Sequence, residues 1–176
     1  MLDTMIVSYF LEVDCEQELA NAAKAFPMTI VEEVRRELRN HKTRGGKNFD
    51  KWLATSNIEV RSIVVGSPAS VTLAQLLRPE APADGRGERA SIALAASDPS
   101  LTFVTHDNAA TIMAVRELWT AGERVLGLAA FLRRLFDNAL VTNHDAAQEI
   151  MSLAYAAAPQ WPTWWATWRA AASASK

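Results

Sequence analysis

The chain of 176 residues contains one cysteine and three histidines. A single cysteine excludes an intramolecular disulfide framework, and three scattered histidines do not indicate a zinc site. The net charge is only −2, which argues against a broadly basic nucleic-acid-binding protein but leaves room for local basic patches. Any chemistry of this chain is therefore expected from other residue types.

Long apolar runs are also missing. No uninterrupted apolar segment is long enough to span a bilayer. The first ten residues carry no Lys or Arg, and Asp3 and Glu12 interrupt the apolar opening stretch, so we expect no signal peptide and no membrane contact. A cytoplasmic protein is the expectation. Hydrophobic residues make up 49% of the chain, which argues against disorder and for one ordinary domain with a buried core.

Short apolar runs alternate with helical patterns along most of the chain. Expected helices cover 5–13, 15–26, 31–41, 47–56, 67–77, 88–97, 108–118 and 129–137. Expected strands cover 27–30, 58–66, 101–105 and 124–128. Ser67 followed by Pro68 is typical of a helix start, and Asp107 or Asn108 is expected to cap the helix at 108–118. The alternation predicts an α/β fold with an open, mainly parallel sheet flanked by helices.

The end of the chain has a different composition. Residues 142–159 predict a capped helix. Four tryptophans that follow it share one stripe of a further predicted helix: Trp161, Trp164, Trp165 and Trp168. The stripe is expected to pack against the domain or, alternatively, to contact a protein partner. We therefore divide the chain into a domain at 1–142 and a C-terminal helical extension with a Trp-rich tail at 143–176.

Acidic side chains stand where four separate elements begin or end. They are Asp3, Glu33, Glu37, Glu88 and Asp107. In α/β sheets functional residues gather at the carboxyl ends of strands, so these acids could form one site. Carboxylates ~4–5 Å apart repel by on the order of 3 kcal/mol per pair, so a shared site needs protonation or a cation. Oxygen ligands favour Mg²⁺ or Mn²⁺, which leads to phosphodiester chemistry with a metal-activated water.

Four segments that carry these acids occur in a fixed order: "LDTMIVSYFL", "IVEEVRREL", "GRGERASIALA" and "LTFVTHDNAA". Together they resemble the four motifs of the PIN-domain family, over roughly residues 1–142. This family consists of metal-dependent ribonucleases, many of them VapC-type toxins of toxin–antitoxin pairs. The resemblance implies a PIN-like fold.

The resemblance also implies the site. Carried over by position, the catalytic and metal-binding residues are Asp3, Glu37, Glu88 and Asp107. Glu33 is the alternative to Glu37, and Thr105 would lie at the edge of the site. The implied activity is Mg²⁺- or Mn²⁺-dependent cleavage of RNA that leaves 5′-phosphate and 3′-hydroxyl ends. RNA is then the substrate, with an antitoxin protein and a homodimer as possible partners.

Two departures from the family pattern motivate an alternative. Met5 stands where the family usually has a polar residue, and only two residues precede Asp3. The alternative is a PIN-like binding module, catalytically weak or inactive, that uses the Trp-rich tail for a protein partner. A deoxyribonuclease of the same metal type is a third hypothesis, because nothing in the residues separates RNA from DNA.

A concentration of positive charge surrounds Glu37. It consists of Arg35, Arg36, Arg39, Lys42, Arg44, Lys47 and Lys51. We interpret this basic run as a solvated helix face or, alternatively, as an edge that follows RNA phosphates with a steep salt dependence. His106, next to Asp107, is interpreted as a surface neighbour, with a general base as the alternative.

Overall fold

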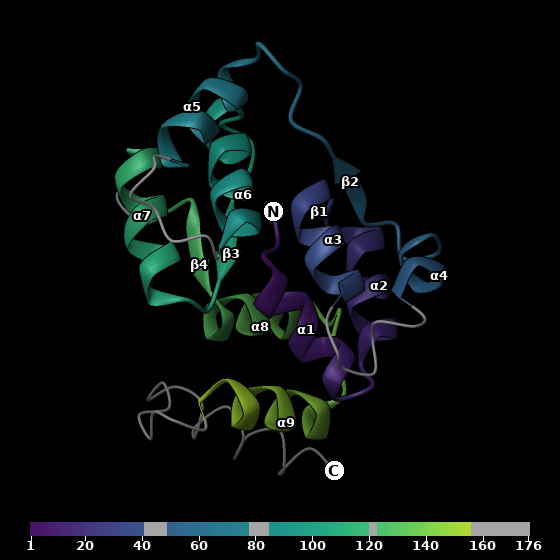
Figure 1. Ribbon diagram of the computed structural model, residues 1–176. Coiled ribbons are helices and arrows are strands. Elements are labelled where there is room, and N and C mark those ends of the chain that lie inside the picture. Colours follow the sequence, from purple (N-terminus) through teal and green to yellow (C-terminus); the bar gives the residue numbers. More distant parts are fainter. Residues whose placement is uncertain (41–48, 78–84, 120–122, 156–176) are drawn as a thin grey trace.

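The computed structural model describes residues 1–40, 49–77, 85–119 and 123–155 (Figure 1). Four short strands form two parallel pairs. β1 (Thr29–Val31) pairs with β2 (Glu59–Arg61), and β3 (Phe103–Thr105) pairs with β4 (Val125–Gly127). The predicted mixed α/β architecture and the predicted parallel pairing are therefore confirmed.

Residues 1–3 connect the two sheets. On one side the Leu2 N–H donates to the Thr29 carbonyl at 2.9 Å. On the other side the Val104 N–H donates to the Met1 carbonyl at 2.8 Å, and the Asp3 N–H donates to the Val104 carbonyl at 3.1 Å. Leu2 and Val104 form a parallel bridge, so this segment runs in the same direction as β3. Asp3 therefore lies at the carboxyl end of the segment, beside the carboxyl end of β3.

Nine helices cover the described strands, and each overlaps a segment predicted to be helical. They are α1 (Thr4–Glu12), α2 (Glu16–Ala25), α3 (Glu32–Asn40), α4 (Phe49–Leu53), α5 (Pro68–Leu76), α6 (Arg86–Ser97), α7 (Asn108–Leu118), α8 (Leu128–Asp137) and α9 (His144–Ala154). Figure 1 shows α2, α3 and α4 grouped with β1 and β2, and α5, α6 and α7 grouped with β3 and β4. None of the described helices combines the length and the apolar character that crossing a membrane requires.

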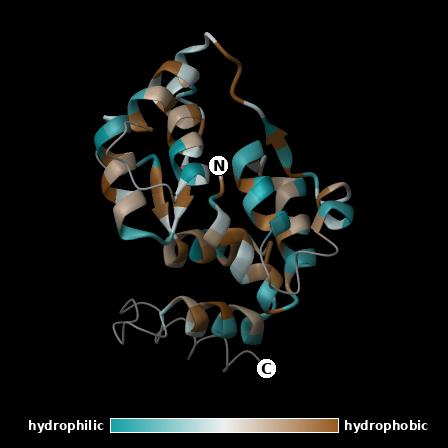
Figure 2. Cartoon of the chain, viewed as in Figure 1, coloured by the Kyte–Doolittle hydropathy of each residue, from teal (hydrophilic) through white to brown (hydrophobic). Residues whose placement is uncertain are grey.

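Apolar spacing explains how these helices pack. In α3 the apolar residues Val34 and Leu38 lie about one helical turn apart and are buried together with Val31 of β1. The remaining α3 residues are hydrophilic, and the helix is largely teal in Figure 2, whereas β3 and β4 are mostly brown. In α8, Leu128 and Leu132 are fully buried at a spacing of one helical turn.

The predicted strand at 58–66 is shorter than expected. β2 ends at Arg61 because its partner β1 ends at Val31, which leaves the following residues without a backbone to pair with. The side chains of Val64 and Val65 are 70% and 95% exposed, so they contribute nothing to the core.

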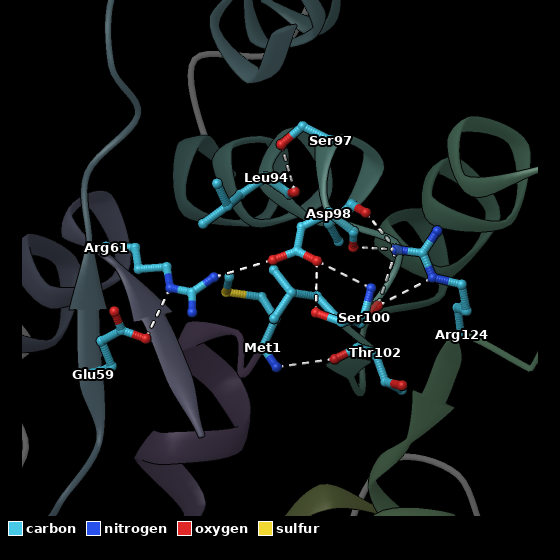
Figure 3. Close-up of polar contacts among 11 residues, drawn as sticks. Met1, Glu59, Arg61, Leu94, Ser97, Asp98, Ser100, Thr102 and Arg124 are labelled. Carbon is cyan, nitrogen blue, oxygen red and sulfur yellow. Dashed lines mark hydrogen bonds and ion pairs between the residues drawn. The ribbon is translucent and has the colours of Figure 1, made fainter. Parts of the chain in front are cut away.

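An arginine network closes the C-terminal end of α6 (Figure 3). The Arg61 guanidinium donates to the Asp98 carboxylate at 3.2 Å, which joins β2 to the end of α6. Asp98 also accepts bonds from the N–H and hydroxyl of Ser100 at 3.0 and 2.6 Å. From the other side, Arg124 donates to the carbonyls of Asp98 and Leu101 at 2.8 and 3.0 Å. The Asp98 carbonyl belongs to the C-cap of α6, where carbonyls lack partners within the helix, and the Leu101 carbonyl belongs to the segment between α6 and β3.

α9 packs on α1 with Ala147, Ile150 and Met151 buried. Its predicted cap is present, since the Asn143 side chain accepts bonds from two backbone N–H groups of the first turn at 3.0 and 3.1 Å. The domain boundary after residue 142 stays a prediction. The four tryptophans of the tail lie outside the described residues.

Candidate functional site

Asp3 is buried at the start of α1. Its side chain is 0% exposed, and its Oδ1 accepts a bond from the Ile6 N–H at 2.9 Å, which caps the helix. Its Oδ2 is buried and has no hydrogen-bond partner among the described residues. A charged oxygen that is buried without a hydrogen bond destabilises the folded protein unless a proton or a positive charge compensates for it.

Burial raises the pKa of Asp3 from its usual 3.8 to about 6. Loss of hydration is the main cause, and the nearby charges of Glu88 and Asp107 raise this pKa further. The Thr105 hydroxyl, which lies near the carboxylate without forming a hydrogen bond to Oδ2, and the Ile6 N–H, which bonds to Oδ1, lower this pKa because they stabilise the carboxylate. Three of the four predicted acids are therefore close enough to influence one another.

Asp107 caps α7 in the same way as Asp3 caps α1. Its Oδ1 accepts a bond from the Ala110 N–H at 2.6 Å, so Asp107, and not Asn108, is the cap. Its own N–H donates to the Thr105 hydroxyl oxygen at 3.1 Å. Asp107 is exposed, whereas Thr105 is buried. Thr105 thus bonds to Asp107 and influences the pKa of Asp3.

Glu37 joins three helices. It lies in α3, accepts a bond from the Thr4 hydroxyl at the start of α1, and accepts a bond from the Gly87 N–H in α6 at 2.9 Å. The carboxylate lies so close to Gly87 that a Cβ atom there would be 2.6 Å from Glu37 Oε2. Residue 87 must therefore be glycine for Glu37 to keep this place.

Glu88 lies in the first turn of α6. Its Oε2 is buried and has no hydrogen-bond partner within the described part of the chain. Burial raises the pKa of Glu88, the charges of Glu37 and Asp107 raise it further, and the cation of Arg89 lowers it. Arg89 is itself buried and was not predicted as a site residue. In the sequence, the feature that could have indicated Arg89 as a site residue is its position directly after Glu88.

The electrostatic influences on Asp3 and Glu88 connect Asp3, Glu37, Glu88 and Asp107, the four acids named from the sequence. Glu33 is not among the charges that shift these pKa values, and its Oε2 is buried without a hydrogen-bond partner among the residues described. The structure therefore places Glu37, the preferred second acid, with the other three.

The four carboxylates are not arranged as a finished metal site. Within the described ranges, no group of three or more His, Cys, Asp or Glu side chains is placed so that it could hold a metal ion. Asp3, Asp107 and Glu37 instead bond to nearby N–H and hydroxyl groups. Two buried oxygens without partners, on Asp3 and Glu88, are nevertheless the ligand type that Mg²⁺ and Mn²⁺ prefer. The chemistry of these donors therefore suits such an ion, although their placement among the described residues does not form a complete site.

Neighbouring acidic side chains form ion pairs with several members of the basic run and so compensate part of its positive charge. The Arg35 guanidinium contacts Asp50 at 3.2 Å and Glu32 at 3.4 Å, and Arg39 contacts Asp50 at 2.8 Å. Arg36 contacts Glu32 at 3.4 Å. Three cations of the run are thus paired, Lys51 is exposed, and the other members, 42, 44 and 47, lie outside the described residues.

Met5 is 40% exposed in the first turn of α1, two residues after Asp3. Its thioether has no oxygen to offer a hard cation. The Asp3 side chain is held by the Ile6 N–H, and the Met5 side chain donates no hydrogen bond to it.

Comparisons with family models, with curated proteins and with solved structures gave no match to this chain. We therefore infer the function of this chain from its residues and their surroundings.

Proposed function

We propose that this chain is a PIN-like endoribonuclease that depends on Mg²⁺ or Mn²⁺. The observation that supports this most is the buried Asp3 carboxylate, which has an oxygen without a hydrogen-bond partner among the described residues and lies near Glu88 and Asp107. A protein that buries an acid and surrounds it with further acids gains from a cation between them.

The carboxylates of Asp3, Glu88 and Asp107 would hold the ion, and Glu37 would hold the ion or its water. An ion bound there would activate a water molecule and neutralise the charge that develops on the leaving oxygen of a phosphodiester. The position supports this assignment, because ligands of α/β proteins bind beyond the carboxyl ends of neighbouring parallel strands. Residues 1–3 and β3 are two such neighbours. Asp3 is the last residue of the first, and Asp107 comes two residues after the end of the second.

The chain's own residues fix the orientation of these acids. Asp3 and Asp107 each bond through Oδ1 to an N–H three residues ahead, which limits the rotation of both side chains. Glu37 is held by the Thr4 hydroxyl and the Gly87 N–H. Arg89 supplies one buried positive charge beside Glu88, which favours the ionised form of this acid. Orientation of this kind is what positioning a nucleophile and a phosphodiester requires.

The first experiment is cleavage of an end-labelled mixed RNA with Mg²⁺, Mn²⁺ or EDTA. We expect cleavage that needs the metal and is lost in Asp3→Asn and Asp107→Asn, because an amide is a weaker ligand than a carboxylate. Asp145→Asn is the matched control, since Asp145 is an exposed acid in the first turn of α9. Cleavage that survives EDTA or both aspartate substitutions would refute the proposal. A labelled DNA of the same sequence separates the ribonuclease from the deoxyribonuclease hypothesis.

We further propose that this ribonuclease is the toxin of a toxin–antitoxin pair. Expression of the active chain alone should arrest growth, and the Asp3→Asn variant should not. Coexpression with an antitoxin protein should restore growth and yield a complex of the two proteins. Normal growth on expression of an active ribonuclease would exclude the toxin role and leave the enzymatic proposal standing.

Glu37 favours the alternative of a binding module. Both of its oxygens are engaged within the protein, so its role in joining α1, α3 and α6 is structural whether or not a metal binds. Isothermal titration with Mn²⁺ distinguishes the two functions. The enzyme must bind the ion through Asp3, whereas a binding module has no need of it.

A further inference from the structure

A groove of about 460 Å³ opens beside Asp107, at the carboxyl ends of β3 and β4. Two rings line it, those of His106 and Tyr155. Thr105, Asn108 and Thr111 add uncharged polar side chains. The volume lies within the range of pockets that hold small organic groups, about 300–1,000 Å³.

The two rings form a fixed wall. The His106 Nε2 lies 2.8 Å from the Ala154 carbonyl, which ties the ring to the end of α9. The His106 and Tyr155 rings pack edge to face, with centroids 4.8 Å apart at 69°. On another side, His106 packs against the buried Tyr9 ring at 5.8 Å and 75°. A ring held at three points keeps its orientation, so the aromatic surface that it contributes to the groove needs no rearrangement when a flat ligand binds.

The lining indicates the chemistry of the ligand. Neither a carboxylate nor a Lys or Arg side chain lines this groove among the described residues, so a free phosphate would find no charged partner in it. A purely apolar ligand would leave the Thr, Asn and His groups without partners. A nucleobase combines a flat ring that stacks with an uncharged edge that forms hydrogen bonds.

We propose that this groove is a subsite for one base of a single-stranded RNA. Its link to the acids is Asp107, because His106 and Asn108, which flank Asp107 in the chain, line the groove. Thr105, whose hydroxyl oxygen accepts the Asp107 N–H, lines it as well. The inference rests on the proposed function, because it assigns the substrate class to that same site. The base would stack on the His106 or Tyr155 ring and bond to Asn108 or Thr111. The adjoining phosphodiester would then lie toward Asp107.

Gly127 makes this proposal testable without touching the acids. It lines the groove, its φ of −74° suits any residue, and a Cβ atom built on it meets nothing within 4 Å. A larger side chain at 127 would therefore enter the groove without backbone strain. Val115 lines the groove from α7, is 42% exposed, and offers a second point of obstruction.

The test measures fluorescence anisotropy of a short labelled single-stranded RNA of mixed sequence in EDTA, so that binding is separated from cleavage. Gly127→Leu and Val115→Phe should each weaken RNA binding about fivefold or more, since stacking of one base has at least this effect. Gly127→Ser is the matched control, because serine is small and is a good cap for α8. Thermal unfolding of all variants shows which of them are folded.

Competition identifies what the groove recognises. Adenosine or uridine should displace the RNA from the wild type and not from the folded Gly127→Leu variant, whereas ribose 5-phosphate, which lacks a base, should not compete. Folded obstructed variants that bind RNA like the wild type would overturn the subsite. Competition by ribose 5-phosphate equal to that of nucleosides would overturn it as well.

The same variants separate this inference from the proposed function. If the wild type cleaves RNA and both folded obstructed variants keep its kcat/KM, the subsite is wrong and the ribonuclease stands. If the wild type never cleaves RNA with either metal while obstruction still weakens binding, the ribonuclease is wrong and the subsite stands.

Discussion

Replacement of Asp3 by asparagine should make the metal-free protein more stable at neutral pH. Asparagine has the shape of the protonated acid and can still cap α1, because its carbonyl oxygen can accept the Ile6 N–H bond now made by Oδ1. It carries no charge, so it removes the unfavourable burial of an ionised oxygen. The expected change is therefore a gain in stability at a residue that the proposed activity requires.

The size of this gain follows from the pKa of Asp3, which folding raises from 3.8 to about 6. Between these two pH values the folded state binds more protons than the unfolded state, so the contribution of Asp3 to stability falls as pH rises. The Asp3 charge then costs the folded protein about 1 kcal/mol at ~pH 4.5 and about 3 kcal/mol at ~pH 7.5. The advantage of Asp3→Asn over the wild type should grow by about 2 kcal/mol across this window.

The assay is urea unfolding followed by far-UV circular dichroism, in EDTA, at several pH values between these limits. An amide and a carboxylic acid differ in hydrogen bonding, but this difference is the same at every pH. Only the change of the wild-type-to-variant difference with pH therefore tests the argument. Asp145→Asn, an exposed acid in α9, should show no such change.

A divalent cation should offset part of this effect. Mg²⁺ or Mn²⁺ at about ten times its dissociation constant should stabilise the wild type by about 1.4 kcal/mol and leave Asp3→Asn unaffected. A difference between wild type and Asp3→Asn that does not vary with pH would refute the reasoning that Asp3 is buried as a charged group. Equal stabilisation of both proteins by the cation would refute its binding at Asp3.

Three further substitutions test other contacts. Gly87→Ala should displace the Glu37 carboxylate from the Gly87 N–H and lower the free energy of unfolding, measured in urea, by about 1 kcal/mol. In a Glu37→Ala background the displaced carboxylate is absent, so the same substitution should stabilise α6. Arg124→Gln should cost about 2 kcal/mol in the same assay, because carbonyls at the end of α6 lose their donor, and Arg124→Lys should recover only part of it. Asp50→Asn should release Arg35 from its ion pair with this residue, strengthen RNA binding at low salt and make the binding more dependent on salt. An RNA affinity equal to that of the wild type would identify the basic run as a solvated helix face that does not contact RNA.

Local patterns made the helices and several caps predictable. The spacing of Val34 and Leu38 placed one face of α3 against the core, and both residues are buried. Asp107 and Ser67 cap their helices because a short polar side chain before an apolar run satisfies the first N–H groups. Each of these features depends on residues a few positions apart, which a single sequence displays directly.

Contacts between distant segments were not predictable in the same way. Nothing in the sequence near Gly87 shows that Glu37, fifty residues earlier, will lie against it. The end of β2 at Arg61 was missed for a related reason, since strand length is set by the partner β1 and not by the apolar residues that follow. The pairing of Arg35 and Arg39 with Asp50 likewise depends on how α3 meets α4.

Helix capping alone explains an aspartate at position 107 but not at position 3. A cap needs one oxygen that accepts an N–H bond, and asparagine or serine supplies it as well as aspartate does. At Asp107 the choice of aspartate costs little, because the side chain is exposed and water solvates its charge. At Asp3 the same choice buries a charge whose second oxygen finds no hydrogen bond among the described residues, next to two further acids. Helix formation therefore accounts for an oxygen at position 3 but not for a negative charge there, which the proposed cation would compensate.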